Sequence, residues 1–96
     1  MYMLVTYDVN TQDKDGRRRL RNVAKCCLDY GQRVQQSVFE LEVNPAQWAE
    51  CKRRLESIAD PELDSLRYYF LGNDWRRKIE HFGVVTSFDI DGPLFA

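Results

Sequence analysis

The chain has 96 residues, which is enough for one domain and too few for two, so residues 1–96 are expected to form a single domain. A formal net charge of −1 excludes a uniformly basic protein, and a hydrophobic fraction of 44% excludes an intrinsically disordered one. A chain this short buries only about two-thirds of its unfolded surface, so a partner subunit would add stability.

The three cysteines, Cys26, Cys27 and Cys51, lack the spacing of a disulfide framework or a zinc site. Free thiols of this kind are typical of a reducing compartment. The opening apolar run is short and has no basic flank, and no segment is long enough to cross a bilayer. We therefore expect a cytoplasmic protein with no membrane partner.

The first predicted element is a strand over residues 2–8, which ends at the carboxylate of Asp8. Its residues are almost all apolar or β-forming, which favours a buried strand. After a polar loop, apolar residues recur at helical spacing and predict a helix over residues 16–29. Gly31 then stands at a position typical of the end of a helix.

Two strands are predicted next, over residues 33–35 and 37–43. In the longer strand, apolar residues at positions 39, 41 and 43 alternate with Glu40 and Glu42. This alternation predicts one buried face and one face that carries the two glutamates.

Asn44 and Pro45 suit the N-cap and the first position of a second helix, which ends before residue 60. Gln47 stands where a capping-box partner would be. A strand over residues 65–71 follows. We then expect a helical turn over 74–78, a short strand over 79–85 and a C-terminal tail over about 86–96.

This order of elements predicts an α+β fold, the ferredoxin-like βαββαβ pattern with a short extra C-terminal strand. Both helices would then cover one face of the sheet. The first and fourth predicted strands are apolar on both faces, so the second face also needs a cover. We expect a homodimer through the sheet face, and partial shielding by the tail is the alternative.

The foremost candidate for a functional residue is Asp8. A carboxylate at a strand end is often only part of an Asx turn, and that interpretation stays open. Magnesium usually takes one or two carboxylates together with waters and phosphate oxygens. If Asp8 lies near a two-fold axis, two copies face each other and can share one ion, which would polarise a phosphodiester.

Positive charge is concentrated in residues 14–33, where seven Lys or Arg residues stand against two acids, a local net charge of +5. Four arginines lie at the start of the predicted helix, where the helix dipole disfavours cations. Their forked guanidinium groups suit phosphate oxygens and predict nucleic-acid binding that weakens with salt. A solvated helix surface with ion pairs is the alternative. The four are Arg17, Arg18, Arg19 and Arg21.

Three segments resemble the CRISPR-associated Cas-two family of spacer-acquisition subunits, and the resemblance covers nearly the whole chain. The block over residues 31–40, which contains Arg-Val-Gln-Gln-Ser-Val-Phe-Glu, is the most specific of them. The other two of these three segments are Leu4-Val5-Thr6-Tyr7-Asp8-Val9, and Arg17-Arg18-Arg19-Leu20 with Val23-Ala24. In addition, the Asp64-Ser65-Leu66-Arg67 segment and the Leu71-Gly72-Asn73 turn resemble the type I-C branch of the family.

The resemblance implies a homodimer in which Asp8 of both protomers binds Mg²⁺ or Mn²⁺ at the dimer cleft. It implies that Tyr7 lies beside this metal site, which makes Tyr7 a second catalytic candidate. It also implies nucleic-acid contacts through arginines of the first helix and through Arg33, with Phe39 near the cleft. Consecutive arginines leave the helix register ambiguous, so the helix candidates are Arg17, Arg18 and Arg19.

The resemblance implies two roles in antiviral defence by CRISPR systems. As an enzyme, the protein would be a metal-dependent endonuclease that cleaves single-stranded RNA or duplex DNA. As an adaptor in spacer acquisition, it would hold duplex DNA and bridge Cas-one integrase subunits. One carboxylate per chain is few for a nuclease, which favours the adaptor as the main role, with nuclease activity weak or conditional. A purely structural adaptor without catalysis is an alternative. An RNA-binding module on the same fold is another, although the K/R-G-F/Y motif is missing.

Overall fold

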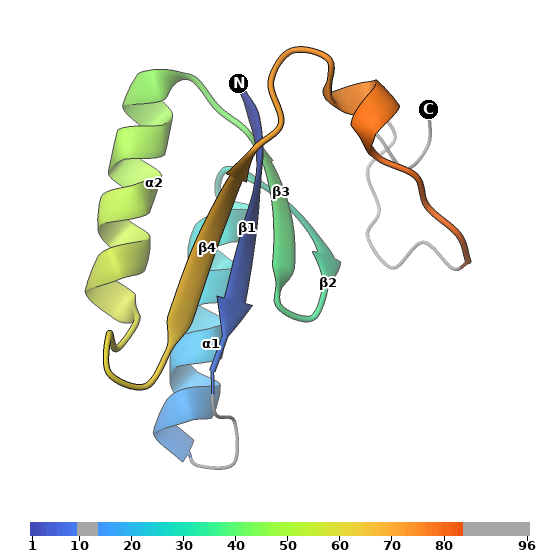
Figure 1. Ribbon diagram of the computed structural model, residues 1–96. Helices are drawn as coiled ribbons and strands as arrows, with labels where there is room; N and C mark the ends of the chain where they lie inside the picture. The colour runs from blue at the N-terminus through green and yellow to red at the C-terminus, as the bar shows by residue number, and fades with distance from the viewer. Residues whose placement is uncertain (10–13, 84–96) are drawn as a thin grey trace.

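The computed structural model describes residues 1–9 and 14–83, which form strands and helices in a βαββαβ order followed by a short 3₁₀ helix. Along the chain the elements are β1 (Tyr2–Asp8), α1 (Lys14–Leu28), β2 (Gly31–Gln35), β3 (Val38–Glu42), α2 (Pro45–Ile58), β4 (Ser65–Phe70) and the 3₁₀ helix η1 (Trp75–Lys78). The four strands form one antiparallel sheet in the order β2-β3-β1-β4, and the two α-helices pack on one face of it (Figure 1). This topology confirms the predicted ferredoxin-like α+β fold.

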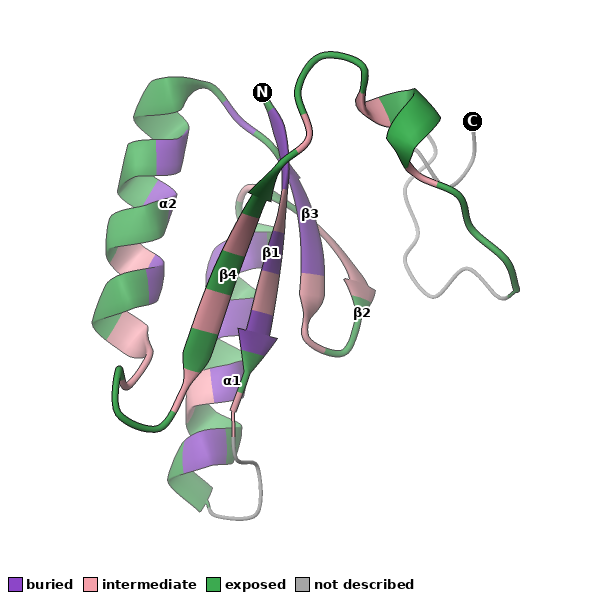
Figure 2. Cartoon of the chain, viewed as in Figure 1, coloured by how far each residue is buried: buried purple, intermediate pink, exposed green. Residues whose placement is uncertain are grey.

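Side chains alternate along β1 and separate a core face of the sheet from an open face. Met3, Val5 and Tyr7 point toward the helices and are at most 1% exposed. They belong to one core with apolar residues of both helices (Figure 2). On the open face, Leu4 is half-buried and Asp8 is exposed. The sheet therefore carries one face that neither α1 nor α2 covers.

The start of α2 has the capping box that the sequence predicts. The Asn44 side chain accepts a hydrogen bond of 2.7 Å from the amide of Gln47, and the Gln47 side chain accepts one of 2.9 Å from the amide of Asn44. Pro45 occupies the first turn, where its missing N–H leaves no donor unsatisfied. Two of the amides that a helix start leaves unpaired are satisfied in this way.

Replacing Asn44 with alanine is expected to lower the free energy of unfolding by about 1 kcal/mol, because the amide of Gln47 loses its acceptor. Urea denaturation followed by circular dichroism measures this change. Asn22→Ala on the exposed side of α1 is the matched control, since it removes the same side chain from a helix interior. Equal stability of the two variants would show that the box contributes nothing.

One expectation about the edge of the sheet needs correction, and one residue there is more buried than its type suggests. Gly31 is the first residue of β2 and does not end the helix with a positive φ. What requires glycine there is space, because a Cβ would lie 2.0 Å from the carbonyl oxygen of Glu40. Glu40 is only 5% exposed, although it lies on the open face, and its carboxylate is satisfied there by a 2.8 Å hydrogen bond from the hydroxyl of Tyr2.

The segment after η1 also differs from the prediction. Residues 79–83 form no strand, while residues 84 and 85 of the predicted strand and the tail lie outside the described residues. The Trp75 ring of η1 stacks on Tyr2 with centroids 3.9 Å apart, so η1 lies against one end of the open face. None of residues 79–83 pairs with a strand of the described sheet. None of the helices in the described ranges is both long enough and apolar enough to span a bilayer.

Candidate metal and nucleic-acid site

Asp8 occupies the last ladder position of the central strand. It pairs with Ser65, the first residue of β4, and its side chain is exposed on the open face. Within residues 1–9 and 14–83 its carboxylate has neither a hydrogen bond nor an ion pair. A carboxylate that is exposed and unpaired keeps its oxygen atoms available for a cation or a solvent molecule.

Two hollows flank this carboxylate, and Asp8 and Val9 line both of them. The first lies toward the β2–β3 turn and includes Gln36 and Ser37. The second lies toward the segment over residues 62–65 that leads into β4. The strand end is therefore accessible from two sides, which a ligand larger than a single ion would need.

Tyr7 lies on the opposite side of β1 from Asp8. Its ring is 1% exposed, and its hydroxyl donates a 2.6 Å hydrogen bond to Oδ2 of Asp64. Burial, followed by the bond to Asp64, raises the pKa of the Tyr7 hydroxyl. The structure thus places Tyr7 behind Asp8, among the helices, with its proton committed to Asp64.

Arg19 meets the same carboxylate from α1. Its Nε lies 2.7 Å from Oδ2 of Asp64 and its Nη2 lies 3.1 Å from Oδ1, which makes a bidentate pair. The side chain of Asp64 is 1% exposed and that of Arg19 is 16% exposed. Of the candidate arginines on α1, Arg19 therefore has its guanidinium bound inside the protein.

Sequence reasoning did not identify Asp64, although it now proves to be the most connected side chain near the site. Its carboxylate also accepts a 2.8 Å bond from the amide of Asp60. Burial would raise the pKa of the Asp64 carboxyl, but the bonds from Arg19, Asp60 and Tyr7 outweigh burial and hold that pKa below its usual range. The local pattern does not distinguish this aspartate from one in an exposed turn, because the side chains that bind it, Tyr7 and Arg19, come from distant parts of the chain.

The other two arginine candidates of α1, Arg17 and Arg18, are exposed. The start of α1 lies at the same end of the molecule as the end of β1, so these side chains and Asp8 share that end (Figure 1). Contact of Arg17 and Arg18 with nucleic-acid phosphates stays a prediction.

Arg33 and Phe39 are brought together on the helix side of the sheet. The guanidinium carbon of Arg33 lies 5.3 Å from the centre of the Phe39 ring, and the two residues are paired across β2 and β3. Phe39 is fully buried and Arg33 is half-buried. Phe39 is therefore a core residue here, and only Arg33 of this pair presents surface to a ligand.

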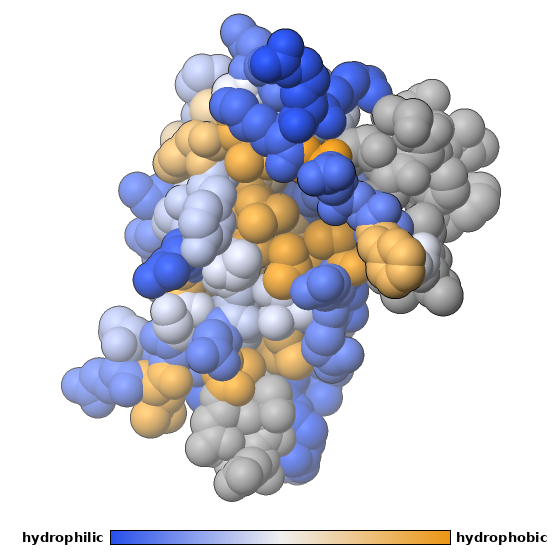
Figure 3. All heavy atoms as spheres, turned by 45° about the vertical axis from the view of Figure 1, so that its right-hand side comes forward, coloured by the Kyte–Doolittle hydropathy of each residue, from blue (hydrophilic) through white to orange (hydrophobic). Residues whose placement is uncertain are grey.

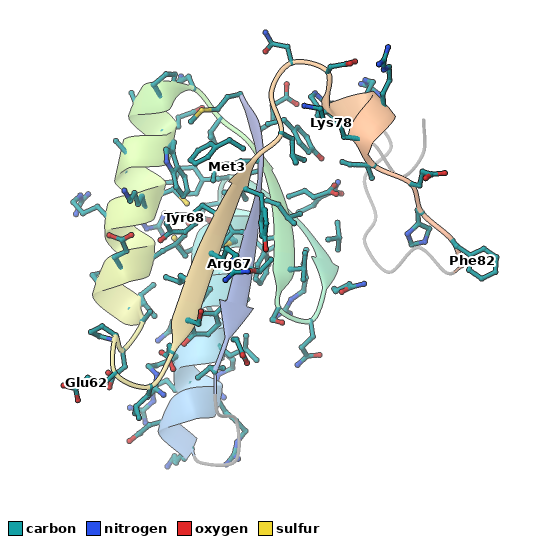
Figure 4. The ribbon with its side chains drawn as sticks, viewed as in Figure 1. Met3, Glu62, Arg67, Tyr68, Lys78 and Phe82 are labelled. Carbon is teal, nitrogen blue, oxygen red and sulfur yellow. The ribbon has the colours of Figure 1, made fainter. Side chains whose placement is uncertain are left out.

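A basic residue that the prediction did not select lies on the open face. Arg67 is exposed on β4 and pairs with Thr6, two ladder positions before Asp8 and Ser65 (Figure 4). Its Nη1 lies 3.3 Å from the hydroxyl of Tyr69 on the same face. The alternation in β4, which puts positions 65, 67 and 69 on one side, is a signal that could have found it.

The surface of the open face is apolar in its middle and charged toward its rim (Figure 3). Leu4 and Val38 are half-buried there, and Tyr69 is 41% exposed. The face thus combines apolar area with an acidic and a basic group near one end.

Comparison with known proteins decides the family. Residues 1–79 match the family described as CRISPR associated protein Cas2. The chain belongs to the Cas2 family. A relative from Rhodospirillum rubrum, named CRISPR-associated endoribonuclease Cas2 3, is 63% identical over 92 residues, which cover 96% of this chain and 97% of the relative. A relative from Halalkalibacterium halodurans, named CRISPR-associated endonuclease Cas2, is 51% identical over 94 residues and covers 98% of both chains.

A solved structure supports the same conclusion at the level of the fold. The crystal structure of Streptococcus pyogenes Cas2 at pH 6.5 superposes with a TM-score of 0.81 and 57% sequence identity, and the match covers 86% of this chain and 100% of that one. The resemblance stated from the sequence is therefore confirmed for the Cas2 family and its fold.

The donor set around Asp8 can be compared with what a divalent cation requires. No group of three or more His, Cys, Asp or Glu side chains suited to a metal occurs in the described part of this Cas2 chain. Magnesium does not require such a group, because it keeps several waters and takes one or two carboxylates. The exposed carboxylate of Asp8, which has no hydrogen bond or ion pair within residues 1–9 and 14–83, fits an ion of this kind.

Proposed function

We propose that the chain forms a homodimer through its open face, binds nucleic acid and cleaves phosphodiester bonds with a divalent cation held by Asp8 of both protomers. The observation that carries this proposal is the exposed Asp8 at the end of the central strand, which has no hydrogen bond or ion pair within residues 1–9 and 14–83 and lies on the face that neither α-helix covers. Two-fold packing of that face would bring the Asp8 carboxylates of the two protomers together.

Each part of the site would have a separate task. The Asp8 carboxylates would hold Mg²⁺ or Mn²⁺, and Arg17 and Arg18 would hold phosphates of the bound strand. A cation there supplies charge that polarises a phosphodiester oxygen and lowers the pKa of a nearby water. Arg33 and Arg67 would add positive charge on either side of the sheet.

The names of relatives support hydrolysis of nucleic acid without deciding its type. The Rhodospirillum rubrum relative is named an endoribonuclease and the Halalkalibacterium halodurans relative an endonuclease. We propose RNA or duplex DNA as the substrate class, and a setting in the spacer-acquisition branch of CRISPR defence. The resemblance of residues 64–67 and 71–73 to the type I-C branch supports a further proposal, that the chain belongs to a type I-C system.

A second candidate role is an adaptor that positions duplex DNA for a Cas-one integrase subunit. The basic residues at the start of α1 favour it, because they offer charge for a backbone and no further catalytic group. The two roles are compatible in one dimer. In the adaptor role, loss of Asp8 would leave DNA binding intact.

Changing Arg17 and Arg18 to alanine together is expected to weaken duplex DNA binding about 10-fold at low salt. The slope of log affinity against log salt should become shallower by about 2 for each protomer that contacts the duplex, because each protomer loses two phosphate contacts. Fluorescence anisotropy with a labelled duplex, repeated at several salt concentrations, measures both quantities.

Lys52→Ala with Arg53→Ala is the matched control, because both residues are exposed on α2 and the net charge changes equally. An equal loss of affinity in the control would mean that net charge alone accounts for binding. Sedimentation of the parent protein at the same concentrations tests the dimer, and a monomer would contradict the proposed site.

A further inference from the structure

The carboxylate of Asp64 joins three separate parts of the chain directly behind Asp8. It receives the hydroxyl of Tyr7 from β1 at 2.6 Å and the guanidinium of Arg19 from α1 at 2.7 and 3.1 Å. It also receives the amide of Asp60 from the end of α2 at 2.8 Å. These four hydrogen bonds all come from the protein itself, so the Asp64 carboxylate is not available to a ligand.

The ladder shows how this junction relates to Asp8. The last pair between β1 and β4 is Asp8 with Ser65, and the pair before it is Tyr7 with Leu66. Tyr7 and Asp64 are the chain neighbours of Asp8 and Ser65. Their hydrogen bond therefore crosses the end of the ladder diagonally on the core side.

The turn that precedes β4 is closed by the same residue. The amide of Asp64 donates to the carbonyl of Asp60 at 2.8 Å, while the Asp64 carboxylate accepts from the amide of Asp60 at 2.8 Å. This reciprocal pair fixes the point at which β4 begins. Since Ser65 follows immediately, the position of the strand partner of Asp8 is fixed with it.

We propose that Asp64 is a positioning residue for Asp8: it holds the end of β1 against the start of β4, so that the Asp8 carboxylate lies in one place on the open face. The inference rests on the proposed metal site in its functional part. Tyr7 and Arg19 then act on the site through Asp64, from the core side, and need not touch nucleic acid.

The affinity of the dimer for Mn²⁺, measured by electron paramagnetic resonance, tests this role directly. Asp64→Asn keeps the shape of the side chain, but its amide faces donors and its charge is lost. The expected result is about a 10-fold weaker Mn²⁺ affinity, as for other residues that orient a ligand. Val23→Ala is the control for general destabilisation, because it removes volume from the buried face of α1 away from Asp8. Unchanged affinity in folded Asp64→Asn, or an equal loss in Val23→Ala, would overturn the inference.

A second variant keeps the test decisive if Asp64→Asn fails to fold. Tyr7→Phe removes only the hydroxyl that donates to Asp64, and about a threefold loss of Mn²⁺ affinity is expected. In the double variant with Asp64→Asn, where that folds, the affinity should equal that of Asp64→Asn alone, because Tyr7 acts through Asp64. A folded Tyr7→Phe protein with parental affinity, or strictly additive losses, would contradict the positioning role.

Amide hydrogen exchange separates this inference from the proposed metal site. In the absence of metal, Asp64→Asn, or Tyr7→Phe in its place, is expected to exchange the Asp8 amide about 10-fold faster, with Val5 in mid-strand unchanged. If Mn²⁺ binding to the parent is the same as to Asp8→Asn, the metal site is wrong, and the exchange rate at Asp8 alone decides the positioning role. Unchanged exchange at Asp8 would refute it.

Discussion

Replacing Asp8 with asparagine is expected to lower metal-dependent cleavage of nucleic acid by about 100-fold or more. The substitution removes the one carboxylate that is exposed and unpaired at the strand end, and in a dimer it removes both copies at once. Because the exposed side chain makes no hydrogen bond or ion pair within the described residues, the free energy of unfolding should stay within about 0.5 kcal/mol of the parent.

The measurement is a cleavage assay with labelled single-stranded RNA and labelled duplex DNA, in Mg²⁺, Mn²⁺ or chelator. Asp29→Asn is the matched control, since it makes the same chemical change at a surface ion pair with Arg54. The control should cut as the parent does. Equal cutting by Asp8→Asn would indicate a contaminating nuclease, and absence of cutting by the parent would leave only the adaptor role.

Replacing Asp64 with alanine is expected to lower the free energy of unfolding by about 3 kcal/mol. The change leaves the buried hydroxyl of Tyr7 and most of the Arg19 guanidinium without their acceptor, and removing one partner of a buried pair is far more costly than removing a surface charge. Asp29→Ala, whose ion pair is 61% exposed on the aspartate side, should cost less than about 1 kcal/mol. Urea denaturation at neutral pH compares the two, and equal losses would contradict the account.

The same carboxylate predicts how stability responds to acid. The pKa of Asp64 in the folded protein lies below its unfolded value, so its contribution is complete above the unfolded pKa, near 4, and is lost as pH falls through the folded pKa. The difference in unfolding free energy between the parent and Asp64→Asn should therefore be largest at neutral pH and shrink below about pH 4. Urea titrations at pH 7 and at acidic pH measure it. A difference that does not change with pH would show that the charge of Asp64 is not involved.

The elements were predictable from the sequence because their signals are local. A run of apolar and β-forming residues marks β1, and alternation marks β3. Helical spacing marks α1 and α2, and the pattern from Asn44 to Gln47 predicts the capping box. The correction at Gly31 has a different origin, since a close approach to Glu40 depends on strand pairing and not on the preceding helix.

The site was predictable only in part, for the same reason. Asp8 stands at a strand end that the pattern locates, whereas the junction at Asp64 depends on partners 57 and 45 residues away in the chain. The separation of Arg19 from Arg17 and Arg18 had a usable signal. Arg19 lies four residues before the buried Val23, beside the apolar stripe of α1, so helical spacing could have placed it inward.

The central claim is that two copies of this chain complete one metal site through Asp8. Native mass spectrometry of the protein with Mn²⁺ measures the number of chains and the number of bound ions in the same particle. The account predicts a dimer that carries one Mn²⁺, and a dimer of Asp8→Asn that carries none. A monomer, or an Asp8→Asn dimer that retains its Mn²⁺, would contradict it.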